Sequence, residues 1–212
     1  MWSPTPKIER WLLKPAVFLA CLTPFLLLVI GLVTSNLGFN PVEHLTHETG
    51  QWGLRFLLVT LAITPLKTLT SLNWLMRFRR MLGLYAFFYA LMHFLIYFVW
   101  DQSLEIGRVF DDVFDRPYIT LGFASLCLMV PLAITSPLWA RRKLRQRWNQ
   151  LHKLMYPLTL LAVLHFVWLV RADYREVSVY AAIFALLMIL RAPPIKNALI
   201  QVFKPKPASA QK

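Results

Sequence analysis

Long apolar runs constrain this chain more than any other feature of its sequence. Trp11–Val33 and Met81–Trp100 consist almost entirely of apolar and aromatic residues. The hydrocarbon core of a bilayer is about 30 Å thick, and a helix needs about 20 mostly apolar residues to cross it. Both runs reach that length, and 58% of the chain is apolar against 16% charged. The sequence therefore predicts an integral membrane protein and excludes a soluble globular enzyme.

Six such runs divide the chain and predict an all-α fold. We expect a polytopic membrane bundle of six transmembrane helices, in a single domain that covers residues 1–212. The expected spans are Trp11–Val33, Trp52–Leu69, Met81–Trp100, Tyr118–Leu138, Leu151–Val170 and Val177–Leu190. The sixth run covers only about 21 Å as a helix, so it has to borrow flanking residues or thin the bilayer.

The positive charges alternate between the two sides of the predicted bundle. All but five of the 23 lysines and arginines lie in the N-terminal tail, the 66–80 loop, the 139–153 segment and the C-terminal tail. The positive-inside rule places these segments and both termini in the cytoplasm. The net charge of +13 follows from this topology and from attraction to anionic inner-leaflet lipid, so it does not indicate nucleic-acid binding.

The chain has no room for a nucleotide-binding domain of its own. Six spans of about 20 residues leave no stretch of the 100–150 residues typical of a soluble domain. The seven glycines never form the G-x-G-x-x-G fingerprint of a dinucleotide site. If the protein does redox chemistry, another molecule has to deliver the electrons.

Three histidines fall inside the apolar spans, where a polar ring is costly and usually serves a partner or a functional path. His93 lies about 12 Å from the outer boundary at Asp101, and His165 lies about 9 Å from the boundary at Arg171. The two rings are therefore expected at nearly the same depth, on helices of the same direction. Two neutral imidazoles facing each other in an apolar bundle suit the axial positions of haem iron, and a hydrogen bond between helices is the plainer alternative.

His152 is predicted at the opposite side of the membrane, about 7 Å inside the cytoplasmic boundary counted from Arg147. The matching level of the third span holds Arg79 and Arg80 rather than a histidine. A second, inner haem ligated by His152 would therefore need an unusual second ligand. The other interpretation is that His152 donates a hydrogen bond to a quinone or a flavin at the inner interface.

Other polar residues suggest further contacts. Arg77, Arg79 and Arg80 are predicted as interfacial anchors that can also meet haem propionates or a flavin phosphate, since a guanidinium fork suits both. The spacing of His44 and His47 could bind a metal, but a solvated outer loop is the simpler interpretation. No C-x-x-C-H motif is present, so any haem is bound noncovalently, as haem b.

Three segments of the chain together resemble one family. They are Arg79-Arg80-Met81-Leu82-Gly83-Leu84 with His93 after it, Arg116-Pro117-Tyr118-Ile119-Thr120-Leu121-Gly122, and Trp148-Asn149-Gln150-Leu151-His152. In their joint occurrence and order they resemble the MsrQ family, the haem-binding membrane subunits of bacterial methionine sulfoxide reductase systems. The chain also resembles the wider ferric-reductase-like transmembrane family, which includes the core of NADPH oxidases.

The resemblance implies a bacterial inner-membrane protein that passes electrons through haem b. The implied donor is the quinone pool or a cytosolic flavin reductase, and FMN is an associated cofactor. The implied partner is a periplasmic, molybdenum-containing methionine sulfoxide reductase that repairs oxidised periplasmic proteins. His93, His152 and His165 are the implied haem-ligand candidates, for one haem or two. The oxidases carry two histidines on the third helix, whereas this chain has only His93 there. The resemblance therefore does not supply a third-helix ligand for an inner haem.

On this interpretation the chain is an electron-transfer subunit of an oxidoreductase complex, with no catalytic site of its own. The acidic outer segment Asp101–Asp115 is expected to form part of the partner's docking surface. A ferric or cupric reductase on the same scaffold would differ only in its outer acceptor. A transporter could instead relay protons or bind an ion through the membrane histidines, although the sequence lacks the repeated halves typical of such transporters.

Overall fold

The computed structural model describes residues 4–170 and 174–203, and every regular element in these two ranges is a helix. The predicted all-α class is therefore confirmed. Arg171, which served to place His165 in depth, lies outside the described residues. Within the described part of the chain, five stretches are long and apolar enough to cross a membrane: Glu9–Val33, Pro41–Thr70, Arg79–Asp101, Pro117–Ile134 and Gln146–Leu169. They agree with a multi-pass membrane protein.

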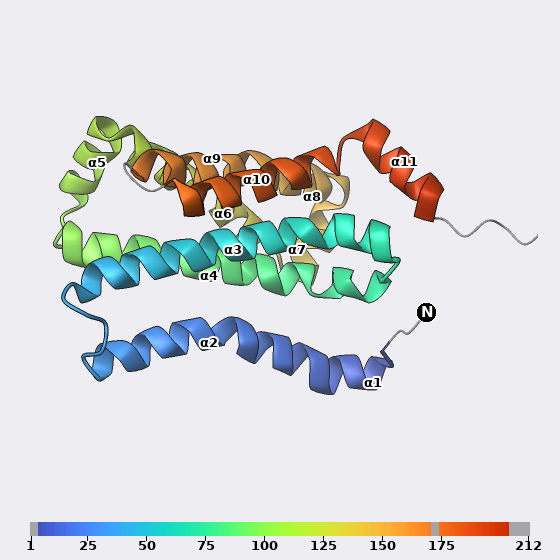
Figure 1. Ribbon diagram of the computed structural model, residues 1–212, viewed down its shortest axis with the longest axis horizontal. Coiled ribbons are helices and arrows are strands. Elements are labelled where there is room, and N and C mark those ends of the chain that lie inside the picture. Colours follow the sequence, from blue (N-terminus) through green and yellow to red (C-terminus); the bar gives the residue numbers. More distant parts are fainter. Residues whose placement is uncertain (1–3, 171–173, 204–212) are drawn as a thin grey trace, which may run out of the picture.

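The predicted sixth span corresponds to α10 (Arg175–Ile189), whose 15 residues extend about 22 Å. This helix is shorter than a bilayer-crossing helix normally is, so the sixth crossing stays a prediction. The first and last helices, α1 (Pro6–Ile8) and α11 (Pro193–Phe203), lie at the same end of the bundle (Figure 1), as an even number of crossings requires.

The other elements follow one another with short connections. In chain order they are the π turn η1 (Glu9–Leu13), α2 (Lys14–Val33), α3 (Pro41–Thr70), the 3₁₀ turn η2 (Asn73–Arg77), α4 (Arg79–Ile96), the π turn η3 (Tyr97–Asp101), α5 (Ile106–Asp115), α6 (Pro117–Ile134), α7 (Leu138–Leu144), α8 (Gln146–Leu151), the 3₁₀ turn η4 (His152–Leu154) and α9 (Met155–Leu169).

Helix α3 begins at Pro41 rather than at the predicted Trp52. The side chain of Asn40 caps it by accepting a hydrogen bond, at 3.2 Å, from the backbone N–H three residues later. Pro41 suits the first turn because its φ angle is already helical and its missing N–H has no partner there. His44 and His47 therefore lie on a helix, and the predicted solvated loop is wrong.

Two helix pairs form the body of the bundle, α3 with α4 and α6 with α9. In the first pair the backbones approach closely at Gly53, where a Cβ atom would lie 3.4 Å from the backbone nitrogen of Ala90. In the second pair the Ser125 hydroxyl donates to the backbone carbonyl of Leu158 at 2.9 Å. Helix α10 packs against α3 and α9. These pairings fix the relative positions of α4 and α9, which carry two of the membrane histidines.

Helix α2 lies at the edge of the bundle (Figure 1), where two tyrosines of α4 hold it. The buried Tyr89 hydroxyl donates to the backbone carbonyl of Cys21 and accepts from the N–H of Phe25, both at 2.9 Å. The hydroxyl therefore lies between the N–H of Phe25 and the carbonyl of Cys21, which would otherwise bond to each other within α2. Side chains inserted in this way bend helices. Tyr85 donates to the carbonyl of Phe18, also at 2.9 Å. The contact between α2 and α4 is thus polar and specific.

The short helix α5 lies across the end of the bundle opposite to α1 and α11 (Figure 1). Asp112 ties it to α4 and α6, because it accepts hydrogen bonds from the Tyr97 hydroxyl at 2.8 Å and the Gln102 amide at 2.7 Å and pairs with Arg116 at 3.3 Å. Four further acids on or near α5 are exposed: Asp101, Glu105, Asp111 and Asp115. We call this the acidic end, and the end with α1, η2, α7, α8 and α11 the basic end.

Candidate functional site

His93 on α4 and His165 on α9 meet near the acidic end of the bundle. Their ring centres are 6.2 Å apart, and the ring planes make an angle of 76°. Both side chains are partly buried. The sequence placed the two rings at nearly one depth, and the structure confirms that they lie next to each other in the bundle. Their role as iron ligands stays a prediction at this point.

Each ring is held by one hydrogen bond to a backbone carbonyl of a neighbouring helix. The Nδ1 atom of His93 lies 2.8 Å from the oxygen of Thr46 on α3, and the Nδ1 atom of His165 lies 2.6 Å from the oxygen of Tyr118 on α6. A carbonyl oxygen can only accept, so Nδ1 carries the hydrogen in both rings. In a neutral imidazole the lone pair is then on Nε2, which is the atom free to bind a metal.

The two histidine sites repeat the same arrangement. One helical turn after each acceptor carbonyl stands a glycine, Gly50 on α3 and Gly122 on α6. A Cβ atom at Gly50 would lie 3.0 Å from the Nδ1 atom of His93, and a Cβ atom at Gly122 would lie 2.9 Å from that of His165. Each ring reaches its carbonyl because the glycine leaves the space open. Both hydrogen bonds also span 47 residues of sequence, a duplicated spacing that the sequence interpretation missed.

The separation of the rings suits a metal bound between them. A metal–imidazole nitrogen bond is about 2 Å long, which puts the ring centre about 3.2 Å from the metal. Two imidazoles on opposite sides of one metal would then have centres about 6.4 Å apart, against the 6.2 Å found here. The donor set and its spacing therefore fit the axial coordination of a haem iron.

A polar network on α3 and α10 lies on the same half of the bundle and was not expected from the sequence. Arg55 donates to the Tyr180 hydroxyl at 2.8 Å, donates to the side chain of Gln51 and lies 3.8 Å from Glu176. The nitrogen of Gln51 in turn lies 3.5 Å from Nε2 of His47. The sequence alone assigns no role to Arg55. In the structure it is the polar link that joins α10 to α3.

His44 and His47 do not form a metal site of their own. Both side chains are exposed, and the His47 ring lies 6.3 Å from the ring of Phe166. Within residues 4–170 and 174–203, no cluster of three or more His, Cys, Asp or Glu side chains is placed to hold a metal ion. The helical i, i+3 pair therefore supplies only two of the four ligands of a tetrahedral site.

His152 lies on the turn η4, directly after α8 at the basic end. Its ring stacks on that of Trp148, with centres 3.8 Å apart and planes at 25°, and its Nδ1 atom lies 3.1 Å from the Trp148 carbonyl. The structure therefore brings no second histidine to this level. Arg79 and Arg141 are its charged neighbours.

The three arginines singled out in the sequence have different surroundings. Arg77 forms an ion pair with Glu9, which is buried, so it anchors the N-terminal segment. The Nε atom of Arg80 donates to the Ser136 hydroxyl at 3.2 Å. Arg79 acts electrostatically on His152. Of the three, Arg79 is the one that lies beside a candidate functional residue.

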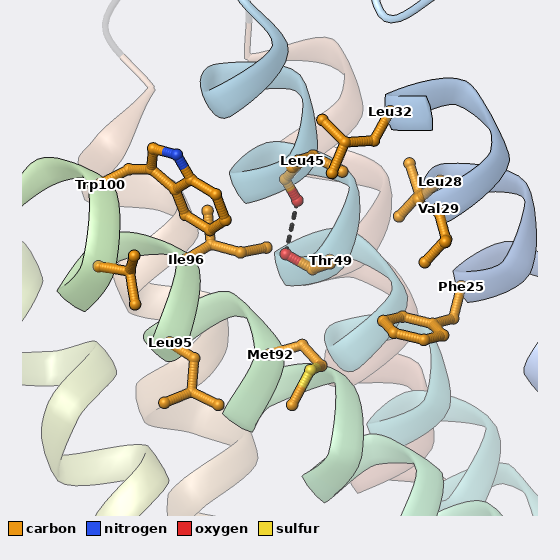
Figure 2. A pocket seen from close by; sticks show the side chains of 11 residues that line it. Phe25, Leu28, Val29, Leu32, Leu45, Thr49, Met92, Leu95, Ile96 and Trp100 are labelled. Atoms are coloured by element: carbon orange, nitrogen blue, oxygen red, sulfur yellow. Dashed lines mark hydrogen bonds between the residues drawn. The ribbon is translucent and has the colours of Figure 1, made fainter. Parts of the chain in front are cut away.

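An apolar groove lies between α2 and the pair α3 and α4, with a volume of about 240 Å³. Figure 2 shows Phe25, Val29, Met92 and Trp100 among the side chains around it. The hydroxyl of Thr49, which also lines the groove, donates to the Leu45 carbonyl of its own helix at 2.6 Å. The groove therefore presents apolar surface and none of the imidazole, carboxylate or thiolate groups that ligate metals.

Comparisons with known proteins match this chain to membrane proteins of one kind. The family model described as "Ferric reductase like transmembrane component" matches residues 49–163, which include His93 and end shortly before His165. Curated relatives named "Protein-methionine-sulfoxide reductase heme-binding subunit MsrQ" are similar over most of their length. The relative from Xanthomonas oryzae pv. oryzae (strain MAFF 311018) is 53% identical over 156 residues, which are 74% of this chain and 72% of the relative.

Two further relatives with the same name cover more of the chain. The relative from Xanthomonas campestris pv. campestris (strain 8004) is 50% identical over 181 residues, 82% of this chain and 83% of its own. The relative from Ralstonia nicotianae (strain ATCC BAA-1114 / GMI1000) is 48% identical over 179 residues, 83% of this chain and 82% of its own. No solved structure matches the chain.

Proposed function

Because the chain belongs to the MsrQ family, within the ferric-reductase-like transmembrane proteins, we propose that it carries electrons across the bacterial inner membrane to a periplasmic methionine sulfoxide reductase. That partner, a molybdenum-containing enzyme, would repair oxidised periplasmic proteins. The relatives are named as haem-binding subunits of a protein-methionine-sulfoxide reductase, and about half of the aligned residues are identical to those of this chain. The chain itself is then an electron-transfer subunit, and the sulfoxide is reduced on its partner.

The observation that carries this function is the pair of rings with free Nε2 atoms, His93 and His165, with centres 6.2 Å apart. Haem b bound between them would supply the one-electron carrier. The carbonyls of Thr46 and Tyr118 fix the tautomer and the orientation of the two rings, and such second hydrogen bonds also raise the basicity of a histidine ligand. The helices around the pair exclude water, which keeps the neighbourhood apolar.

The basic end is the proposed donor side and faces the cytoplasm, in agreement with the positive-inside rule. The donor is a quinone or a cytosolic flavin reductase, with FMN as a further cofactor. His152 is a hydrogen-bond donor or a ligand there, and Arg79 beside it adds positive charge. Arg77 and Arg80 contribute less, because Glu9 and Ser136 already engage them.

The acidic end is the proposed acceptor side and faces the periplasm. The exposed carboxylates of Glu105, Asp111 and Asp115 on and beside α5 give it a negative surface close to the histidine pair. Such charge mainly accelerates encounter with a partner and orients it. We therefore expect the association rate of the periplasmic reductase to fall as salt concentration rises, and an unchanged rate would argue against docking at this end.

One optical experiment tests the proposed function. The chain, purified from cells supplied with haem, should show Soret and α bands that change on reduction with dithionite, and a colourless protein would contradict electron transfer as well as metal reduction. The reduced protein is then mixed with the periplasmic reductase and methionine sulfoxide, or with ferric citrate. Reoxidation with the first pair alone supports the proposal. Reoxidation with ferric citrate alone would instead identify a ferric reductase.

A further inference from the structure

A small pocket at the basic end lies apart from the histidine pair, and its lining residue Tyr156 follows His152 by four positions. It opens between the end of α3, the start of α9 and the end of α10, and its volume is about 140 Å³. One water needs about 10–15 Å³ of such space, so the pocket has room for a larger polar group. The residues that line it are Thr64, Pro65, Thr68, Tyr156, Leu190 and Arg191.

Arg191 is fixed in this pocket by a gap in the hydrogen bonding of α3. Pro65 has no N–H, so the carbonyl of Leu61, one turn earlier, has no helical partner. The Nη2 atom of Arg191 donates to that carbonyl. The guanidinium also lies over the ring of Tyr156, 5.4 Å from its centre. One edge of the guanidinium is therefore anchored, and its position is defined before any ligand binds.

Two polar atoms at the pocket, Nη1 of Arg191 and Oγ1 of Thr64, are buried and have no hydrogen-bond partner among the described residues. Leaving a buried donor unpaired destabilises the fold, and more so when the donor is charged. Among the described residues, no carboxylate lies within salt-bridge distance of Arg191, and the groups that act on it electrostatically are Tyr156 and the positive Arg79. The pocket therefore combines two unused donors with a positive charge that no carboxylate neutralises.

We propose that this pocket binds the oxyanion of a phosphate group, with its oxygens accepting hydrogen bonds from Nη1 of Arg191 and Oγ1 of Thr64. A guanidinium with one free edge suits the oxygens of phosphate, and the hydroxyl supplies a second donor. The phosphate can come from the headgroup of a phospholipid or from a phosphorylated cofactor, since both carry the same chemistry. The pocket contains neither His93 nor His165, so its failure would leave the proposed haem binding by that pair untouched.

Thermal unfolding of the full chain in a phosphate-free detergent tests the site. Four probes are added separately: FMN, riboflavin, dihexanoyl-phosphatidylglycerol and dihexanoylglycerol. A phosphate site predicts a higher unfolding midpoint with FMN or the phospholipid and no change with the matching phosphate-free compound. FMN alone identifies a cofactor site, and the phospholipid alone identifies a lipid site. Equal stabilisation by both members of a pair, or none by any probe, overturns the proposal.

Thr64→Val is the decisive variant, because it removes only the unpartnered hydroxyl. We expect no loss of stability without ligand and about tenfold or greater weakening of phosphate binding. Thr60→Val is the matched control, since Thr60 lies one turn earlier on α3 and donates to the Phe56 carbonyl at 2.7 Å. It should bind like the unaltered chain. Equal affinity in both variants, or a clear loss of ligand-free stability in Thr64→Val, would show that the hydroxyl has another role. Arg191→Gln should bind still more weakly, but it also frees the Leu61 carbonyl.

Discussion

The two polar sites of this bundle, one near each end, make opposite chemical demands. Near the acidic end, His93 and His165 have their N–H groups engaged and each keep a nitrogen lone pair free. At the basic end, Arg191 and Thr64 have donors without acceptors. The first site can give electron pairs to a metal, while the second can give hydrogen bonds to oxygens. A polar group inside an apolar bundle thus indicates its ligand through the atoms that remain unpaired.

Each site depends on a residue whose backbone differs from that of other helical residues, and α3 carries one such residue at each site, Gly50 and Pro65. At Gly50 the missing Cβ leaves space for the His93 ring to reach the backbone carbonyl of Thr46 on α3. At Pro65 the missing N–H leaves a carbonyl free for a guanidinium. The side chain at the centre of each proposed site is positioned by a main-chain oxygen. Gly50 and Pro65 therefore mark the positions where a backbone carbonyl of α3 accepts a hydrogen bond from a side chain of another segment.

The largest difference between the two ends is expected when a histidine of the pair is replaced and bound haem is measured. His93→Ala and His165→Ala should each reduce bound haem to less than about a tenth of that in the unaltered chain, because six-coordinate iron loses an axial ligand. His44→Ala, at an exposed position near the same end, is the control and should keep its haem. Absorbance of the Soret band per chain measures the effect. Haem retained in both of the first two variants would refute the assignment.

A smaller effect is expected when the glycine beside His165 gains a methyl group. In Gly122→Ala the new Cβ would lie 2.9 Å from Nδ1 and 3.2 Å from Cγ of the ring, so the ring has to move away from the Tyr118 carbonyl. Overpacking of this kind costs about 1–3 kcal/mol. We expect a lower unfolding midpoint and an altered low-spin electron paramagnetic resonance spectrum.

Two other glycines sharpen this prediction. Gly50→Ala should act in the same direction but less strongly, because its Cβ would lie 3.7 Å from Cγ of His93. Gly83→Ala is the control, since its nearest contact would be an ordinary 3.7 Å to Thr60. If Gly83→Ala altered the spectrum as much as Gly122→Ala, the glycines would not be positioning the rings.

At the basic end, Pro65→Ala should act on the phosphate site alone. The new N–H can bond to the Leu61 carbonyl, which releases Arg191 from its anchor. Phosphate binding should then weaken about fivefold, the value of roughly one hydrogen bond. The haem bands should be unchanged, because the histidine pair lies near the other end. Affinity for FMN or dihexanoyl-phosphatidylglycerol is the measurement, and a changed haem spectrum would contradict the separation of the two sites.

The smallest effect on haem is expected from His152→Ala. The ring stacks on Trp148 and faces no second histidine, so the haem content should remain that of the unaltered chain. Steady-state reduction by quinol or by a flavin reductase should slow if the donor binds beside it. A loss of half the haem would instead reveal an inner haem ligated by this residue.

The sequence predicted the all-helical fold and the nearness of His93 and His165, because both follow from local patterns of apolar residues. It placed the start of α3 too late, since His44, His47 and Glu48 interrupt the hydropathy although Asn40 and Pro41 begin the helix. Polar residues in a transmembrane helix end its apolar run without ending the helix itself.

Contacts between distant segments could not be predicted in the same way. Arg191 and Pro65 come together only through the packing of α10 and α11 on α3, and no local spacing shows their contact. The two glycine and carbonyl positions beside the histidines left a weak signal, the repeated separation of 47 residues. That signal becomes meaningful only once the pairing of α3 with α4 and of α6 with α9 is known.

The ratio of haem to protein tests the central claim most directly. It should be measured on the purified chain and on the double variant His93→Ala/His165→Ala, with haem quantified as its pyridine complex and protein by amino-acid analysis. One haem per unaltered chain and none in the double variant is the predicted result. A chain without haem, or a double variant that keeps a full equivalent, would contradict iron ligation by the paired rings.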